Sequence, residues 1–118
     1  MREHIGLFRG KRKDNGEWAE GAYAPPFKAP NGKEYGVSIT VVGESGWLED
    51  IYVDPNTIGE CTSLKDKNGK LIFEHQAIKY AGELYEVRMW VGMWCMFDKW
   101  EHYCELYKFA ADSEILEG

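Results

Sequence analysis

The segment of residues 53–79 constrains the fold of this 118-residue chain most, because its turn signals fix where extended segments must end. Asp54-Pro55 predicts a turn, since proline fixes its own φ and moves the preceding residue out of the helical region. Asn68-Gly69 predicts a hairpin with a type I′ turn, which needs positive φ at two consecutive residues. Strands are expected at residues 71–73 and 77–80, so a β-barrel or an antiparallel sheet fits this segment.

Further strands are predicted where β-branched, aromatic or alternating residues run between turn signals. They cover residues 7–13, 17–23, 35–42, 47–53, 84–90, 93–97 and 102–109. Residues 24–33 contain three prolines and are expected to form a mobile loop. Residues 101–111 also have helical spacing, so strand and helix both stay open there. Residues 111–116 are expected to form one turn, with Asp112 or Ser113 as its N-cap.

Three runs within residues 53–79 resemble a pattern of the YopX family of small phage and prophage proteins. They are V-D-P-N-T-I-G at 53–59, L-K-D-K-N-G-K at 64–70 and I-F-E at 72–74. The chain departs from the pattern at Ser63, where glycine is usual, at His75-Gln76, where Gly-Asp is usual, and at Ala77, where isoleucine is usual. Loss of a glycine from a turn predicts a changed backbone or partner at that point.

The resemblance implies a C-terminal SH3-type small β-barrel and a phage or prophage accessory protein whose biochemical role is unknown. Together with the strand pattern it predicts an all-β fold in one domain of residues 1–118. An N-terminal antiparallel hairpin sheet is expected at about 1–53, a barrel at about 54–118, and one short helical turn near the C-terminus.

The charge of the chain is −6 and is unevenly distributed. Residues 1–35 carry seven Lys or Arg against five Asp or Glu, and residues 36–118 carry seven against fifteen. The acidic larger part disfavours nucleic acid as a partner, because phosphates repel it. The basic residues of the first strand are a weak candidate site for phosphate contact. The alternative is that they form a solvated strand face whose charge Glu17 and Glu20 balance. The residues concerned are Arg9, Lys11, Arg12 and Lys13.

No apolar run approaches the roughly 20 residues of a membrane span, and Arg2-Glu3-His4 does not open a signal peptide. We therefore expect a cytoplasmic protein of a bacterial host. Its three cysteines lack disulfide-framework spacing and are expected to be reduced thiols.

The sequence contains no nucleotide-binding, nucleophile-elbow or zinc motif. Cys95, His102 and Cys104 supply neither the number nor the spacing of a zinc site. The expectation is a non-enzymatic protein with no catalytic, metal or cofactor site and no cofactor.

Residues 80–109 contain nine aromatic residues, and such residues are enriched at protein interfaces. Strand alternation puts Glu86, Arg88 and Trp90 on the face opposite Val87 and Met89. Because unpaired charges are costly to bury, we expect this face to reach solvent. The candidate protein interface comprises Trp90, Trp94, Trp100, Tyr103 and Tyr107, with Tyr103 and Tyr107 on one face of the last strand.

The function expected from these patterns is binding of a protein partner, or self-association. The alternatives are a small barrel that binds nucleic acid and an acidic inhibitor of a host defence system.

Overall fold

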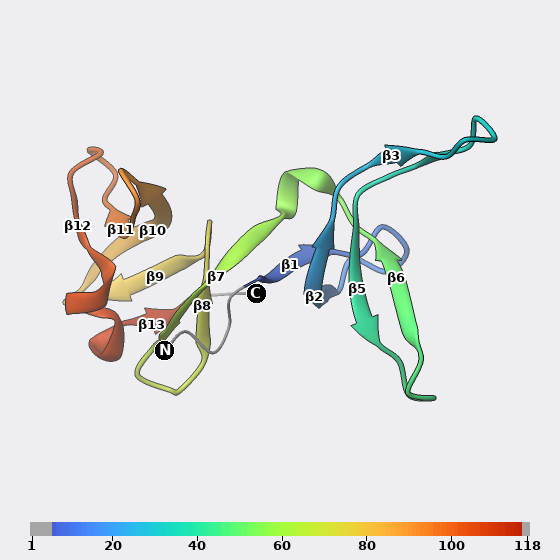
Figure 1. The fold of residues 1–118 in the computed structure, drawn as a ribbon. Coiled ribbons are helices and arrows are strands. Elements are labelled where there is room, and N and C mark those ends of the chain that lie inside the picture. The colour runs from blue at the N-terminus through green and yellow to red at the C-terminus, as the bar shows by residue number, and fades with distance from the viewer. Residues whose placement is uncertain (1–5, 117–118) are drawn as a thin grey trace. The chain divides into compact units, whose positions relative to one another are not determined.

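The computed structural model describes residues 6–116, which form antiparallel strands and three short 3₁₀ turns (Figure 1). The chain divides into two compact units, an N-terminal unit of Gly6–Glu60 and a C-terminal unit that begins at Cys61. The prediction of an all-β fold is confirmed. Closure of an SH3-type barrel stays a prediction. The expected boundary between the N-terminal hairpin sheet and the barrel, at about residues 53 and 54, also stays a prediction.

The N-terminal unit is a twisted antiparallel sheet with the strand order β6-β5-β2-β1-β7. Its strands are β1 (Leu7–Lys11), β2 (Trp18–Ala24), β5 (Ser38–Val42), β6 (Leu48–Tyr52) and the first two residues of β7 (Gly59–Lys65). Arg12 forms a bridge with Val53, so the sheet folds back on itself at one end. The short helix η1 (Pro55–Thr57) follows, and the Asp54 side chain caps it by accepting a hydrogen bond from the Asn56 N–H.

One face of this sheet holds a small apolar core of Ala19, Ile39 and Val53, surrounded by partly buried aliphatic side chains and Phe8. Gly21 lets β2 and its neighbour β5 approach closely at the end of their pairing, because a Cβ atom there would collide with the Thr40 carbonyl oxygen.

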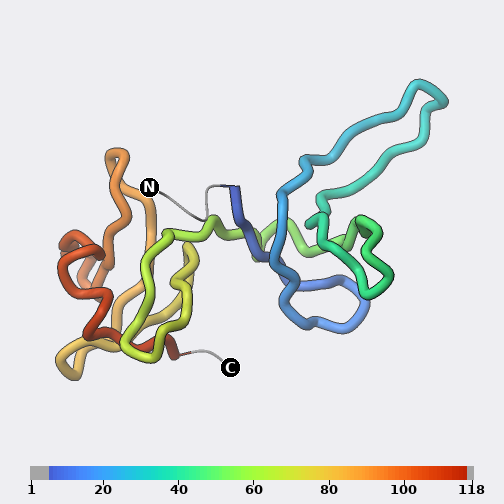
Figure 2. Tube along the Cα trace, turned by 60° about the horizontal axis from the view of Figure 1, so that its bottom comes forward, coloured from blue at the N-terminus to red at the C-terminus, as the bar shows by residue number. Residues whose placement is uncertain are grey.

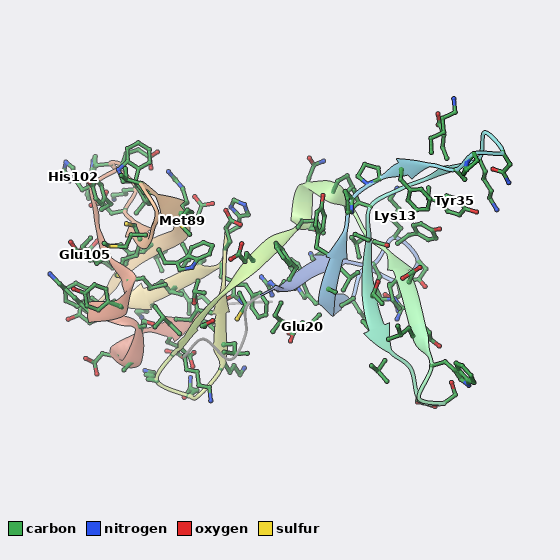
Figure 3. All side chains as sticks on the ribbon, viewed as in Figure 1. Lys13, Glu20, Tyr35, Met89, His102 and Glu105 are labelled. Carbon is green, nitrogen blue, oxygen red and sulfur yellow. The ribbon has the colours of Figure 1, made fainter. Side chains whose placement is uncertain are left out.

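The loop expected at residues 24–33 instead forms part of a paired two-stranded arm. β3 (Phe27–Lys28) pairs with β4 (Glu34–Tyr35), and the arm extends away from the rest of its unit (Figures 1 and 2). The Phe27 and Tyr35 rings stack with centroids 4.8 Å apart (Tyr35 is labelled in Figure 3). The predicted continuous strand at 35–42 is wrong. It divides into β4 and β5, because Tyr35 pairs with Phe27 in this arm whereas β5 pairs with β2.

The C-terminal unit contains a five-stranded antiparallel sheet with the order β12-β11-β10-β9-β13, and the hairpin of β7 and β8. The bounds are β8 (Leu71–Phe73), β9 (Ala77–Tyr80), β10 (Glu83–Trp90), β11 (Met93–Phe97), β12 (Tyr103–Glu105) and β13 (Glu114–Ile115). Its core is aliphatic and fully buried at the centre. The core residues are Ile72, Ile78, Val87, Met96, Leu106 and Ala110.

The predicted strand at residues 102–109 is wrong beyond Glu105. The chain turns there into η2 (Leu106–Lys108) and then η3 (Ala110–Asp112). A continued strand would put Leu106, Lys108 and Ala110 on one face, whereas the 3₁₀ turns bury Leu106 and Ala110 and leave Lys108 outside.

The predicted N-cap at Asp112 or Ser113 is also wrong, because the helical turn ends there instead of beginning. The Ser113 hydroxyl donates to the Ala110 carbonyl, and β13 follows by pairing with β9. Where one short C-terminal helical turn was predicted, the chain forms two 3₁₀ turns.

The Asn68-Gly69 hairpin has a three-residue connection in place of the predicted type I′ turn. The Gly69 N–H donates to the Asp66 carbonyl, and only Gly69 of the pair has positive φ. The same hydrogen-bond pattern recurs at three other hairpins. The left-handed residue is Gly32 in the first of these hairpins and Gly46 in the second. In the third it is Glu101, the one residue of the four that is not glycine.

Candidate protein-binding surface

The outer face of strands β10–β12 carries the candidate site, on the side opposite the aliphatic core. Residues paired across antiparallel strands share a face, and Glu86 pairs with Phe97, which pairs with Tyr103. Arg88 and Trp90 follow Glu86 on the same face of β10. We call this set the Arg88 aromatic surface: Glu86, Arg88, Trp90, Phe97, Glu101 and Tyr103.

Three aromatic rings form the apolar part of this surface. The centroid distances are 6.1 Å for Trp90–Phe97, 5.4 Å for Phe97–Tyr103 and 6.2 Å for Trp90–Tyr103. Phe97 is buried beneath its neighbours, whereas Trp90 is 49% and Tyr103 55% exposed. The structure therefore confirms the predicted exposure of Trp90 and Tyr103.

Arg88 fixes the charged part of the surface. Its guanidinium lies 4.5 Å from the Phe97 ring centroid. It donates two hydrogen bonds, of 2.9 and 3.0 Å, to the Glu101 carboxylate and one of 2.8 Å to Glu86. Hydrogen bonds to Glu101 and Glu86 raise the pKa of Arg88, and Arg88 lowers the pKa of Glu101. The result is a charged side chain pre-organised over an aromatic cluster, a combination that interfaces favour.

Glu101 reaches Arg88 from the β11–β12 turn with φ of 63°. A left-handed conformation is costly for a residue with a Cβ atom. The Asp98 side chain stabilises this turn by accepting the N–H groups of Trp100 and His102 at 2.9 Å. The turn thus holds Glu101 in a fixed position for its contact with Arg88.

The other aromatic residues of the predicted interface lie elsewhere on the unit. Trp94 is on the core face and half-buried, so it does not extend the Arg88 aromatic surface. Trp100 is exposed in the β11–β12 turn, where the Lys99 ammonium lies 4.4 Å from its ring centroid. Tyr107 is exposed as predicted, but it lies on η2, so the predicted shared strand face with Tyr103 is wrong.

The first-strand basic residues do not form a common phosphate-binding face. Arg9 is only 6% exposed, and its guanidinium lies 3.6 Å from the Trp18 ring centroid. The prediction that Arg9 lies on a solvated face is therefore wrong, because the Trp18 ring covers it. Lys11 and Lys13 are the exposed members of this set beside a half-buried Arg12.

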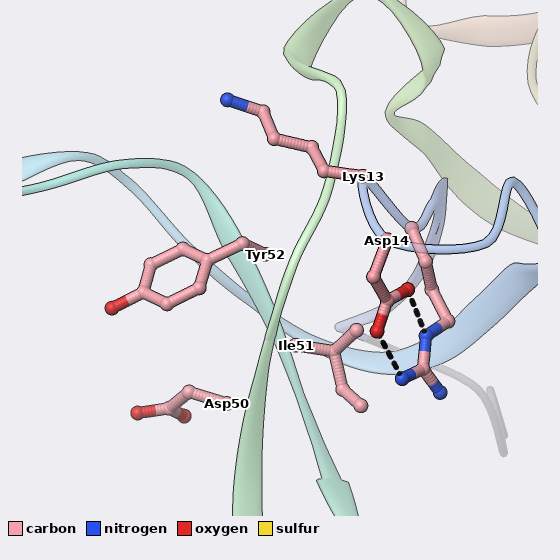
Figure 4. Close-up of a pocket in the computed structure, with 6 residues that line it drawn as sticks. Lys13, Asp14, Asp50, Ile51 and Tyr52 are labelled. Carbon is pink, nitrogen blue, oxygen red and sulfur yellow. Dashed lines mark hydrogen bonds and ion pairs between the residues drawn. The ribbon is translucent and has the colours of Figure 1, made fainter.

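Arg12 is engaged by Asp14 through hydrogen bonds of 2.9 and 2.8 Å (Figure 4). This contact raises the pKa of Arg12 and lowers that of Asp14. Both residues line a pocket of about 390 Å³ with Lys13, Asp50, Ile51 and Tyr52. Because Arg12 already has an acidic partner, a phosphate at this pocket would have to displace Asp14.

The sequence alone did not reveal the contact between Arg88 and Glu101. Thirteen positions separate the two residues, and only the β10–β11 hairpin and the β11–β12 turn bring them together. The exposed residues Val42, Trp47 and Leu48 of the β5–β6 hairpin were missed as well. The available signal was an apolar pair next to a Gly-Glu-Ser-Gly turn.

Cys95 and Cys104 lie on opposite faces of the sheet, since Cys104 pairs with Met96 and Cys95 with Glu105. Burial raises the pKa of both thiols. Within residues 6–116 no group of three or more His, Cys, Asp or Glu side chains is arranged to hold a metal ion. The described part of the chain also has no helix with the length and apolarity that crossing a membrane requires.

Comparison with known proteins gave no match, either to a protein-family model or to a curated protein sequence.

Proposed function

We propose that this chain is a non-enzymatic accessory protein that acts by binding another protein through the Arg88 aromatic surface. The observation that carries the proposal is an exposed Trp90–Tyr103 pair beside a guanidinium held in place by two carboxylates. Trp, Tyr and Arg are the residues that contribute most to binding energy at interfaces. A group that is already fixed loses little conformational entropy on binding.

The proposal includes a phage or prophage origin in a bacterial host, from the resemblance to the YopX family. Two backbone positions support that resemblance. Ser63 and His75 stand where the family pattern has glycine, and both have positive φ, 67° and 73°. Glycine is the residue that adopts this conformation without strain, so a glycine pattern at these two positions fits this backbone. Ser63 and His75 adopt the left-handed conformation themselves, so the changed backbone that we expected from the loss of glycine is not required at these positions.

The experiment is affinity capture with the tagged full chain from extracts of the bacterial host, with and without phage infection. A Trp90→Ser/Tyr103→Ser variant should lose the captured partner. Tyr107→Ser is the matched control, because Tyr107 is equally accessible but lies outside the ring cluster. Equal capture by the double variant and the wild type would disprove the role of this surface.

Light scattering on the same proteins measures the self-association part of the proposal. If the partner is a second copy, the wild type should show a concentration-dependent mass and the double variant should stay monomeric. A strict monomer at all concentrations would restrict the proposal to a different protein partner.

A further inference from the structure

The β5–β6 hairpin of the N-terminal unit exposes a second apolar group. Val42 is 70%, Trp47 77% and Leu48 73% exposed. Val42 and Leu48 are paired across the hairpin and share a face, and Trp47 directly precedes β6, where its carbonyl accepts the Gly43 N–H. Large apolar side chains this exposed on a single hairpin are typical of an interaction site.

The charged side chains of this hairpin are all acidic, and the cations that border its far end, Arg12 and Lys13, lie beside Asp50 and Tyr52, with Arg12 already bound to Asp14. Residues 34–64 contain six Asp or Glu and no Lys or Arg. Glu44, Glu49 and Asp50 lie on the hairpin itself, among the three apolar side chains. Anionic lipid and nucleic acid would be repelled, and β6 strands of two copies would bring like charges together. The complementary partner is basic.

The backbone of β6 offers hydrogen-bonding groups at the same place. The hydrogen bonds to β5 use alternate residues, as the Gly43–Trp47 and Val37–Val53 contacts show. Leu48 and Asp50 therefore direct their N–H and C=O groups away from β5. Among residues 6–116, no strand pairs with this edge at those two residues. At the other end of β6, the Tyr52 carbonyl already accepts the Lys13 N–H.

We propose that the β6 edge binds a basic, extended segment of a partner protein by strand addition. The partner segment alternates lysine or arginine with apolar residues. Its backbone pairs with Leu48 and Asp50. Its apolar side chains share the face of Val42 and Leu48, and its cations lie on the opposite face, that of Trp47 and Glu49. The inference is independent of the Arg88 aromatic surface.

The test uses a synthetic probe, acetyl-Lys-Val-Lys-Val-Lys-Val-Lys-amide, titrated into the ¹⁵N-labelled full chain and followed by NMR. The expected result is saturable shifts centred on the Leu48 and Asp50 amides. A peptide with Glu in place of Lys, and one N-methylated at alternate residues, should each bind at least tenfold more weakly.

A Trp47→Ser/Leu48→Ser variant should lose at least tenfold in affinity for the probe. Its matched control is Trp100→Ser/Leu84→Ser, which makes the same two substitutions at exposed residues of the C-terminal unit. Trp90→Ser/Tyr103→Ser should also keep full affinity, which separates this test from that of the proposed function.

Five outcomes would overturn the proposal. Equal binding of the acidic peptide would rule out charge complementarity, and equal binding of the N-methylated peptide would rule out strand addition. Dimerisation that Trp47→Ser/Leu48→Ser abolishes would identify a second copy as the occupant. Absence of saturable binding, or binding of anionic lipid vesicles at Trp47 instead, would exclude the basic segment.

Discussion

Glu101 binds the guanidinium of Arg88 through two hydrogen bonds while its own backbone is left-handed, with φ of 63°. The hairpin turn at Asp66 has the same hydrogen bonds, but there the equivalent residue is Gly69, with φ of 78°. A glycine at residue 101 would therefore suit the turn better. Strained positions of this kind cluster at functional sites, which fits a binding role for the Arg88–Glu101 pair.

We predict that Glu101→Gly raises the thermal midpoint and weakens partner capture. The substitution removes backbone strain in the turn and loses only an exposed ion pair. It also releases Arg88 from its position over Phe97, so binding should fall. Thermal unfolding and affinity capture on the same preparation measure the two effects.

Gly69→Ala is the matched control for this substitution. It introduces strain into the equivalent turn, where a Cβ atom would meet open space, so only the backbone conformation changes. We expect it to destabilise the fold by about 1 kcal/mol. A lower midpoint for Glu101→Gly as well would show that the ion pair outweighs the strain.

We predict that Asp66→Asn destabilises the C-terminal unit by about 2–3 kcal/mol. The buried Asp66 carboxylate accepts the N–H groups of Asn68 and Lys70 through one oxygen and that of Ile115 through the other. An asparagine amide nitrogen cannot accept a hydrogen bond, so at least one donor would lose its partner. Asp98→Asn is the control and should cost less, because the two N–H groups that Asp98 accepts lie within its own turn, whereas Asp66 also binds Ile115 of a distant strand.

The Asp66 contribution should also depend on pH. Burial acts to raise the pKa of Asp66, but hydrogen bonds from the backbone N–H groups of Ile115, Lys70 and Asn68 outweigh it and lower the pKa below its ordinary value. The folded state then binds the proton less tightly than the unfolded state. The stabilisation is therefore complete above the ordinary pKa and is lost as the pH falls through the folded value. Denaturant titrations from pH 6 to pH 3 should show this loss in the wild type and a smaller one in Asp66→Asn.

Local turn chemistry predicted most strand positions. Asp54-Pro55 and Asn68-Gly69 both lie where the chain reverses, and the alternation in β10 correctly separates Val87 from Arg88 and Trp90. Prediction failed where tertiary contacts decide the conformation. Residues 106–112 follow the burial of Leu106 and Ala110 rather than the local β-propensity, and the Pro-rich segment pairs because Phe27 and Tyr35 stack.

The candidate site was predictable only in part, for a related reason. Exposure of Trp90 and Tyr103 follows from strand period and from the cost of burying charge. The position of Arg88 over Phe97 depends on a hairpin register and on the conformation of Glu101, which the sequence does not specify. Arg9 was predicted to lie on a solvated strand face, because no pattern in the neighbouring sequence indicates that the Trp18 ring covers it.

We predict that Gly21→Ala destabilises the N-terminal unit by about 2–3 kcal/mol. A Cβ atom at residue 21 would collide with the backbone carbonyl of Thr40, so β2 and β5 would have to move apart. Gly36→Ala is the matched control, because a Cβ atom there would have no neighbour within 4 Å and φ is not positive. It should be neutral or slightly stabilising. Chemical denaturation of both variants checks the difference, and equal midpoints would contradict the close approach of β2 and β5 at residue 21.

The last prediction concerns Ser63 and His75, the left-handed residues where the family pattern has glycine. Ser63→Gly and His75→Gly should each stabilise the fold by about 0.5–1 kcal/mol, because glycine adopts positive φ without the clash of a Cβ atom. Ser45→Gly, at a turn residue without positive φ, should destabilise by a few tenths of a kcal/mol through the larger entropy of the unfolded chain. Stabilisation by Ser63→Gly and His75→Gly, with destabilisation by Ser45→Gly, in urea denaturation would support the left-handed backbone that the resemblance implies at residues 63 and 75. Destabilisation by both Ser63→Gly and His75→Gly would instead show that these two side chains contribute contacts worth more than the strain.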